Sequence, residues 1–344
     1  MKKLIKKQLA LFEQVSEIII AARSSIVRNT NLSMVMSYYL VGMRIVEHEQ
    51  SGNTRAQYAK TILSSLSQKL KKKFGKGYSV DNLENMRRFY LVYSISENGS
   101  RKLKTSKNRI MQLPTFTLGW SHYLILCRIE DEPERKFYEI EATTNSWSLE
   151  EFQRQLNTSL YERLVKSNNK KKILALSKRG QIIKEPKDII KSPLVLEFLG
   201  LEEKAFYSET DLETAIITQI EKFMLELGKG FFFGGRQVRF TFDEKHFFVD
   251  LVFYNRLLKC FVIVDLKIGE LEHADLGQMQ MYVNYYDRKI KDKAENPTIG
   301  IIICKNKNDA VVEITLPKNQ KQIFASQYKL YLPSKAALKK LIEK

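Results

Sequence analysis

The sequence predicts two domains, an all-helical N-terminal domain followed by an α/β domain with one mixed sheet. Up to about residue 165, apolar residues recur every three or four positions, which is the period of amphipathic helices. From Thr210 onward, helical segments mix with runs rich in aromatic and β-branched residues, which is typical of strands in a layered α/β domain. At 344 residues, 44% of them hydrophobic, the chain can bury two cores.

Residues 1–94 are expected to form consecutive helices. Two of these span about residues 33–49 and 55–74, and a glycine-rich turn follows the second. Ser79 is placed to cap the next helix. A helix, a short turn and a second helix are together compatible with a helix-turn-helix.

The helical domain is expected to end near residue 165. Ser148 and Glu151 form a capping box for a helix that ends near Leu164. Residues 166–209 place glycine, proline and a lysine run between short apolar patches, which is typical of a loosely packed connection. The expected organisation is therefore a basic helical domain 1–165, a connecting segment 166–209 and an α/β domain 210–344.

The α/β domain is expected to begin with a helix that Gly228 closes. Three strands joined by short loops should then form an antiparallel meander. A helix and a buried strand follow, and the last stretch adds an edge strand and a terminal helix from Ser334. The expected elements are helix 212–227, strands 231–242, 246–254 and 257–266, helix 276–286, strand 298–304 and an edge strand from about 323.

The net charge of +18 is concentrated in the N-terminal part. Residues 1–200 carry 35 Lys and Arg against 19 Asp and Glu, whereas residues 201–344 carry 22 against 20. This asymmetry favours a domain that binds a phosphate backbone, although a generally basic protein or a solvated helix face would have the same composition. The residues expected to contact nucleic acid here are Lys71, Lys72, Lys73, Lys76, Arg87 and Arg88.

Several classes of protein are disfavoured by the composition. Cys127, Cys260 and Cys304 are isolated, so neither a disulfide framework nor a zinc site is supported. No apolar run approaches the ~18 residues of a membrane helix. A cytoplasmic protein that does not contact membranes is the simplest expectation.

Two aspartates interrupt hydrophobic strands, and a lysine follows the second. Because side chains two apart on a strand share a face, Asp265 and Lys267 should point the same way. Asp250 and Asp265 together could hold Mg²⁺, which needs only one or two protein carboxylates. The lysine would then orient water or stabilise negative charge, which predicts metal-dependent phosphodiester hydrolysis. The alternative is an ordinary ion pair between Lys267 and either aspartate.

The order of these residues resembles the PD-(D/E)XK nuclease superfamily, in the subgroup with a Q-x-x-x-Y helix. Similarity to the bacterial YhcG-like proteins, with their all-helical N-terminal domain, extends over nearly the whole chain. The segments that carry it include Arg55-Ala56-Gln57-Tyr58, Asn82-Leu83-Glu84-Asn85-Met86-Arg87, Gly235-Arg236-Gln237, Asp265-Leu266-Lys267 and Gly277-Gln278-Met279-Gln280. The resemblance implies a restriction-endonuclease-like fold with Asp250, Asp265 and Lys267 as the active-site triad, and Mg²⁺ or Mn²⁺ as cofactor.

Two departures from the superfamily pattern are visible. Val249 stands in place of the proline, and Asp265 replaces the commoner glutamate. The superfamily often adds a glutamate from the preceding helix, for which Glu213 is the first choice and Glu221 the second. Thr210 and Glu213 also fit a T-x-x-E capping box, which would explain Glu213 without a metal.

Four more residues are expected near the site. Gln278 and Tyr282 lie four apart and share a helix face, where they would contact the DNA backbone or the active-site network, or merely form a polar residue beside a packed aromatic. Arg236 and Gln237 are expected to face the same cleft and bind nucleic acid.

The sequence thus predicts a Mg²⁺-dependent DNA endonuclease to which a basic helical domain delivers the substrate. The alternative is a non-catalytic DNA-binding or assembly protein that retains the nuclease fold. RNA is a further possible target. A homo-oligomer and a process such as restriction or repair are compatible with the sequence but are not specified by it.

Overall fold

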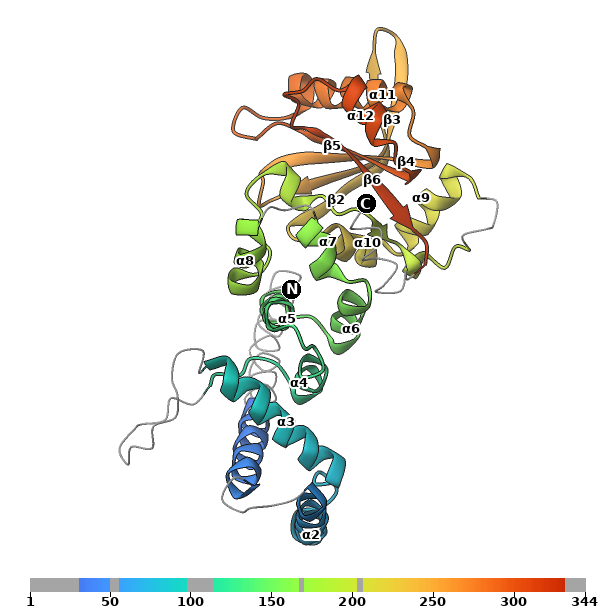
Figure 1. The fold of residues 1–344 in the computed structure, drawn as a ribbon. Coiled ribbons are helices and arrows are strands. Elements are labelled where there is room, and N and C mark those ends of the chain that lie inside the picture. Colours follow the sequence, from blue (N-terminus) through green and yellow to red (C-terminus); the bar gives the residue numbers. More distant parts are fainter. Residues whose placement is uncertain (1–30, 50–55, 98–113, 167–169, 203–206, 332–344) are drawn as a thin grey trace, which may run out of the picture. The chain divides into compact units, whose positions relative to one another are not determined.

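The computed structural model describes residues 31–49, 56–97, 114–166, 170–202 and 207–331. The chain divides into two compact units, residues 1–152 and 153–344. The first is helical, and the second combines a mixed sheet with helices (Figure 1), which confirms the predicted fold class. The helix expected before residue 31 and the terminal helix from Ser334 lie outside the described residues. The domain boundaries at 165 and 209 stay a prediction.

The first unit is built around an aromatic core. Residues 31–49 are helical, and they are followed by α2 (Ala56–Phe74), α3 (Val80–Glu97), α4 (Trp120–Leu126) and α5 (Glu132–Thr144). Phe89 is fully buried, and its ring centroid lies 4.8 Å from that of Phe116 and 5.0 Å from that of Tyr123. Ser79 caps α3 as predicted, because its Oγ accepts a hydrogen bond from Asn82 N at 3.1 Å. The helix-turn-helix stays a prediction.

The second unit contains one sheet with the strand order β1-β6-β5-β4-β3-β2 among the described residues. The predicted meander is confirmed, because β3 pairs antiparallel with both β2 and β4. The parallel half pairs β4 with β5, β5 with β6 and β6 with β1. The strands are β1 (Leu194–Val195), β2 (Phe231–Phe242), β3 (Lys245–Asn255), β4 (Cys260–Glu270), β5 (Ile299–Asn306) and β6 (Ile323–Lys329).

The strand expected at the edge of the sheet, β6, has a neighbour on each side. Strand β6 is covered by β1, whose Leu194 and Val195 pair with Tyr328 and Lys329. Both residues of β1 are buried, so the prediction of loose packing is wrong for this part of residues 166–209. That segment also forms α8 (Lys170–Arg179) and two short 3-10 turns, Pro186–Ile189 and Glu197–Leu199.

Helices cover both faces of the sheet. On one face, α9 (Glu209–Thr218) and α10 (Ile220–Leu227) bury Leu212, Ile216 and Phe223 against β3, β4 and β5. On the other, α11 (His273–Tyr285) packs Met279 and Val283 on the same strands (Figure 1). The close approach of α11 requires a glycine in β5, because a Cβ on Gly300 would lie 2.5 Å from Met279 Sδ.

Two helices predicted as continuous are broken. The expected helix 212–227 divides into α9 and α10 at Gln219, whose φ of −116° and ψ of 33° are not helical. The break lets both halves bury apolar side chains in the same core. Likewise, the expected helix ending near Leu164 divides into α6 (Leu149–Asn157) and α7 (Leu160–Lys166). Ser159 there has a φ of 49°, outside the right-handed helical region.

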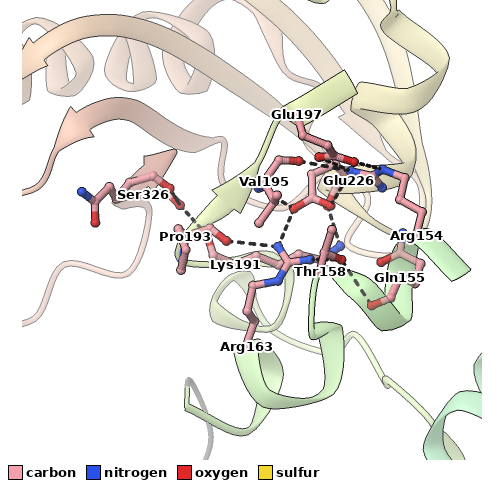
Figure 2. A network of polar contacts seen from close by, with 11 residues as sticks. Arg154, Gln155, Thr158, Arg163, Lys191, Pro193, Val195, Glu197, Glu226 and Ser326 are labelled. Carbon is pink, nitrogen blue, oxygen red and sulfur yellow. Dashed lines mark hydrogen bonds and ion pairs between the residues drawn. The ribbon is translucent and has the colours of Figure 1, made fainter. Parts of the chain in front are cut away.

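A buried charge network joins α6 and α7 to the sheet (Figure 2). Arg163 Nη1 donates to Glu226 Oε1 at 2.5 Å, Arg154 Nη2 donates to Glu226 Oε2 at 3.3 Å, and Val195 N donates to Oε1 at 3.0 Å. Lys191 Nζ donates to the backbone oxygen of Glu226 at 2.5 Å. Glu226 and Arg163 are both completely buried. This network anchors the first helices of the second unit to its core.

Candidate active site

The site lies where β3 and β4 separate. Their backbone pairing runs from Asn255 and Cys260 to Leu251 and Val264 and ends there. One residue further along β3, the side chain of Asp250 bonds to β4 in place of the backbone. Its Oδ2 accepts a hydrogen bond from Leu266 N at 2.8 Å. A carboxylate thus satisfies a backbone donor that the diverging strand no longer reaches.

Asp265 and Lys267 share one face of β4. Val264 and Leu266 point into the core beneath α9 and α10, and alternation places the two charged residues on the opposite face. Asp265 is 3% exposed, and its Oδ2 lies 3.0 Å from Lys267 Nζ. Lys267 Nζ also lies 3.6 Å from Glu209 Oε2. Nothing in the sequence pattern singled out Glu209, because it is the first residue of a helix whose start was expected later.

The charges at this point do not balance. Burial and the neighbouring Asp250 raise the pKa of Asp265 to about 7, although Lys267 opposes the shift. Burial disfavours the charge on Lys267, but Asp265 and Glu209 outweigh this effect and raise the pKa of its ammonium. Two neighbouring aspartates with one lysine leave an excess of negative charge that a cation would compensate.

Glu213 is not a capping residue. The capping box at the start of α9 is formed by Ser208 and Asp211, so the predicted Thr210 and Glu213 box is wrong. Glu213 is instead 3% exposed and lies deeper in the helix, where its Oε1 is 2.8 Å from Arg236 Nε. The cap moved because α9 begins earlier than the apolar pattern indicated.

Gln237 links Glu213 to the aspartates. Its Nε2 donates a hydrogen bond to Glu213 Oε2 and another, of 3.0 Å, to Asp250 Oδ1. The left-handed φ of 46° at Gln237 lets Arg236 and Gln237 both approach Glu213. The alternative residue, Glu221, is exposed on α10. The structure thus brings Glu213, Gln237 and Asp250 together.

The donor set fits a hard divalent cation. Among the described residues, Asp265 Oδ2 and Glu213 Oε1 are buried carboxylate oxygens that face only the cations of Lys267, at 3.0 Å, and Arg236, at 2.8 Å, and carboxylate oxygens are the ligands that Mg²⁺ prefers. The described part of the chain contains no group of three or more His, Cys, Asp or Glu side chains arranged to hold a metal. Asp250 and Asp265 would be the first ligands, and Glu213, which Gln237 and Arg236 contact, stays a prediction as the third.

Gln278 and Tyr282 lie together on α11. Gln278 Nε2 donates to the Tyr282 hydroxyl at 2.5 Å, and Tyr282 is 1% exposed. Burial raises the pKa of the Tyr282 phenol, and the charges of Asp265 and Asp250 add to this effect. The charges of both aspartates and Lys267 therefore act on Tyr282, and the role of the pair in the active site stays a prediction.

The predicted nucleic-acid contacts of the first unit differ in availability. Lys71, Lys72, Lys73 and Lys76 are exposed around the end of α2, and Arg88 is exposed on α3. Arg87 is already engaged, because its Nε lies 2.7 Å from Glu49 Oε2. Its charge is therefore partly compensated, which sequence spacing could not show because the two residues lie on different helices.

Comparison with known families assigns both parts of the chain. Residues 187–343 match the family described as the YhcG PDDEXK nuclease domain, and residues 14–163 match the DUF1016 N-terminal domain. The chain is 36% identical over 335 residues to the Escherichia coli (strain K12) protein named "Putative nuclease YhcG", covering 92% of this chain and 89% of that protein. The chain belongs to the YhcG family of PDDEXK nuclease-domain proteins.

Two solved structures match part of the chain. A repair endonuclease from Pyrococcus abyssi matches 38% of this chain and 50% of its own, at 16% identity and a TM-score of 0.25. The structure of an EndoMS–dsDNA2 complex matches 39% of this chain and 49% of its own, at 17% identity and a TM-score of 0.28. Among the described residues, no helix is long and apolar enough to cross a membrane.

Proposed function

We propose that the chain is a Mg²⁺-dependent endonuclease that hydrolyses phosphodiester bonds in DNA. The observation that carries this proposal is the placement of buried Asp265 beside Asp250, with Lys267 Nζ 3.0 Å from the Asp265 carboxylate, where two strands separate. Membership of the PDDEXK nuclease family supports it. The charge of Asp265 is costly to bury, because Lys267 alone does not neutralise both aspartates.

Each residue has a distinct proposed role. Asp250 and Asp265 would hold the cation, which, when bound, supplies charge neutralisation to the phosphate. Lys267 would orient the attacking water and stabilise the negative charge that develops on the phosphate. Gln278 would position the Tyr282 hydroxyl, which lies 2.5 Å away, toward the same network. Mn²⁺ would also serve as the cofactor in place of Mg²⁺, since both ions prefer oxygen ligands.

The helical domain is proposed to bind the DNA and deliver it. Support comes from the exposed lysines 71, 72, 73 and 76, together with Arg88, because clustered cations release counterions from a phosphate backbone. In the second unit, Arg236 has 44% of its side chain exposed while it contacts Glu213, so it can contact a phosphate near the site. Competition between DNA and RNA would distinguish the two polymers.

The test is a cleavage assay with the full chain. Plasmid, linear, branched and single-stranded DNA are incubated with Mg²⁺ or Mn²⁺, and products are resolved on gels. The wild type should cut at least one substrate, Lys267→Ala should not, and Lys318→Ala should behave as the wild type because Lys318 is exposed and remote in sequence from the site. Wild-type protein that leaves every substrate intact with both metals would refute the proposal.

A second candidate function rests on Gln237. Its amide nitrogen donates to Glu213 and Asp250 together, so the two carboxylates already share a hydrogen-bond donor. A non-catalytic DNA-binding or assembly protein with a nuclease fold would keep this arrangement permanently. Salt-dependent DNA binding without cleavage, and no calorimetric signal on adding Mg²⁺, would select this alternative.

A further inference from the structure

The β2–β3 hairpin continues past the point where β3 leaves β4. From Val238 and Val249 outward, the two strands pair only with each other, up to Phe242 and Lys245. One side of this ribbon packs on α11 (Figure 1). Phe240 stacks on Tyr285, with ring centroids 4.1 Å apart, and on Phe247 at 5.3 Å. The packed side fixes the ribbon and leaves its other side facing away from α11.

The free side of the ribbon begins at the candidate active site. Gln237 and Asp250 are joined across the strands by a 3.0 Å hydrogen bond. Two residues further, Arg239 and Phe248 are register partners, so their side chains share a face. Because alternate residues of a strand point the same way, Phe248 lies on the side of Asp250 and opposite Phe247.

Phe248 and Arg239 are exposed side chains for which the described residues supply neither a ring contact nor an ion pair. Phe248 is 46% exposed, Arg239 is exposed, and within the described residues Arg239 makes no ion pair. A large aromatic beside an uncompensated cation is the pairing that proteins use to bind single-stranded nucleic acid, because the ring stacks on a base and the cation contacts the backbone. Two residues of strand, about 7 Å, separate Phe248 from Asp250.

We propose that the Arg239–Phe248 face binds the substrate strand next to the scissile phosphate, with Phe248 stacked on an unpaired base. This rests on the proposed nuclease function and specifies its substrate: DNA that is single-stranded, branched or mismatched at the cleavage point. In a continuous duplex, the neighbouring bases cover both faces of each base, so the Phe248 ring would find no base to stack on. Arg239 contacts the adjoining phosphate.

The proposed contact surface does not extend to the tip of the ribbon. The turn residues Asp243 and Glu244 have φ values of 51° and 63° and are acidic, so the end of the ribbon does not favour phosphate. Thr241 Oγ1 and His246 Nδ1 are engaged with each other at 2.9 Å. The contact is therefore confined to the pair nearest the site.

The ribbon offers a matched control. Phe242 is 57% exposed, belongs to the same hairpin, and by alternation lies on the side of Phe240 rather than that of Phe248. The experiment compares Phe248→Ala, Phe248→Leu, Phe248→Trp and Phe242→Ala in the full chain. Phe248→Leu keeps an apolar side chain but removes the ring, and unfolding midpoints of all variants verify that they fold.

Two oligonucleotide substrates are used, one fully paired and one with an unpaired 2-aminopurine at the cleavage point. Phe248→Ala and Phe248→Leu should each lower kcat/KM on the unpaired substrate by at least about tenfold, within the range expected for loss of one base stack. Phe242→Ala should change it by less than about twofold, and Phe248→Trp should retain it. Quenching of 2-aminopurine fluorescence by the wild type should also be lost in Phe248→Ala.

The outcomes separate this inference from the proposed function. If the wild type cuts no DNA, the nuclease proposal fails, and the quenching and binding comparison of Phe248→Ala with Phe242→Ala still decides the role of Phe248. Equal effects of Phe248→Ala and Phe242→Ala would overturn the inference. So would a loss of self-association in Phe248→Ala on analytical ultracentrifugation without any change in binding, because the face would then be an interface between two copies of the chain.

Discussion

Two carboxylates of the second unit are both buried, but their pKa values are shifted in opposite directions. Glu226 on α10 is 0% exposed, and Asp265 on β4 is 3% exposed. Burial opposes ionisation at both. At Glu226, however, Arg163, Lys191 and Arg154 outweigh burial and lower the pKa to about 2. At Asp265, the neighbouring Asp250 adds to burial, and the pKa is raised to about 7.

The difference distinguishes a structural charge from a functional one. Glu226 accepts hydrogen bonds from Arg163, Arg154 and the backbone of Val195, so its charge is compensated without any ligand. The buried Oδ2 of Asp265 has one close cation, Lys267 at 3.0 Å, which it shares with Glu209. The fold compensates the charge of Glu226 fully, whereas at Asp265 it leaves the charge that the proposed cation would compensate.

Removing Glu226 should have the largest effect on stability. Glu226→Ala leaves Arg163, which is completely buried, without its anionic partner, and breaking a buried pair in this way costs about 3–5 kcal/mol. The free energy of unfolding, measured by urea denaturation, should fall by that amount.

Glu221→Ala is the control for this variant. Glu221 belongs to the same helix but is exposed, so its removal should change the free energy of unfolding by less than about 0.5 kcal/mol. A loss below about 1 kcal/mol for Glu226→Ala would show that the network contributes little.

The same network predicts how stability depends on pH. A lowered carboxyl pKa means that the unfolded chain binds more protons between the two pKa values, so stability is lost as the pH falls. For Glu226 this loss should extend from the ordinary glutamate value of about 4.3 down toward about 2. The contribution is about 3 kcal/mol. Denaturation curves between pH 6 and 3 should therefore converge for the wild type and Glu226→Gln, and parallel curves would contradict the assignment.

Neutralising Asp265 should have the opposite effect to removing Glu226: a large loss of activity with little loss of stability. Asp265→Asn should lower the cleavage rate at least about 100-fold, because it removes one of the two proposed cation ligands, and loss of one preorganised active-site group has an effect of this order. In the absence of metal, its free energy of unfolding should stay within about 1 kcal/mol of wild type or increase. The physical reason is that repulsion from Asp250 is relieved while Lys267 keeps Glu209 within 3.6 Å. A strongly destabilised Asp265→Asn would make Asp265 a structural charge like Glu226.

Much of this arrangement could be predicted from the sequence, because hydrophobic strands show clear patterns. Strand β2 spans the predicted residues 231–242, and charged residues inside such strands drew attention to Asp250, Asp265 and Lys267. Strand β1 could not be predicted, since two residues are too short for a periodic signal. Its pairing with β6 depends on contacts distant in sequence.

The role of Glu213 could not be predicted either. Two capping patterns overlap at this helix start, Ser208 with Asp211 and Thr210 with Glu213, and both satisfy the same spacing rule. The choice between them depends on where α9 meets the sheet, which brings Glu213 to Arg236 and Gln237. The network around Glu226 was missed for a similar reason, because Arg163 and Glu226 are 63 residues apart.

The smallest expected effect concerns Glu213, whose role could be structural, like that of Glu226, or could belong to the proposed active site, like that of Asp265. If Glu213 supports the cation, Glu213→Gln should raise the Mg²⁺ concentration for half-maximal cleavage by about tenfold, the lower end for residues that support metal ligands. If it only anchors Arg236, Arg236→Met should have the same effect, because that variant removes the 2.8 Å ion pair but leaves the carboxylate. A Mg²⁺ titration of both variants decides between these roles. Equal shifts would assign Glu213 to structure, as for Glu226, whereas a shift in Glu213→Gln alone would place it with Asp265.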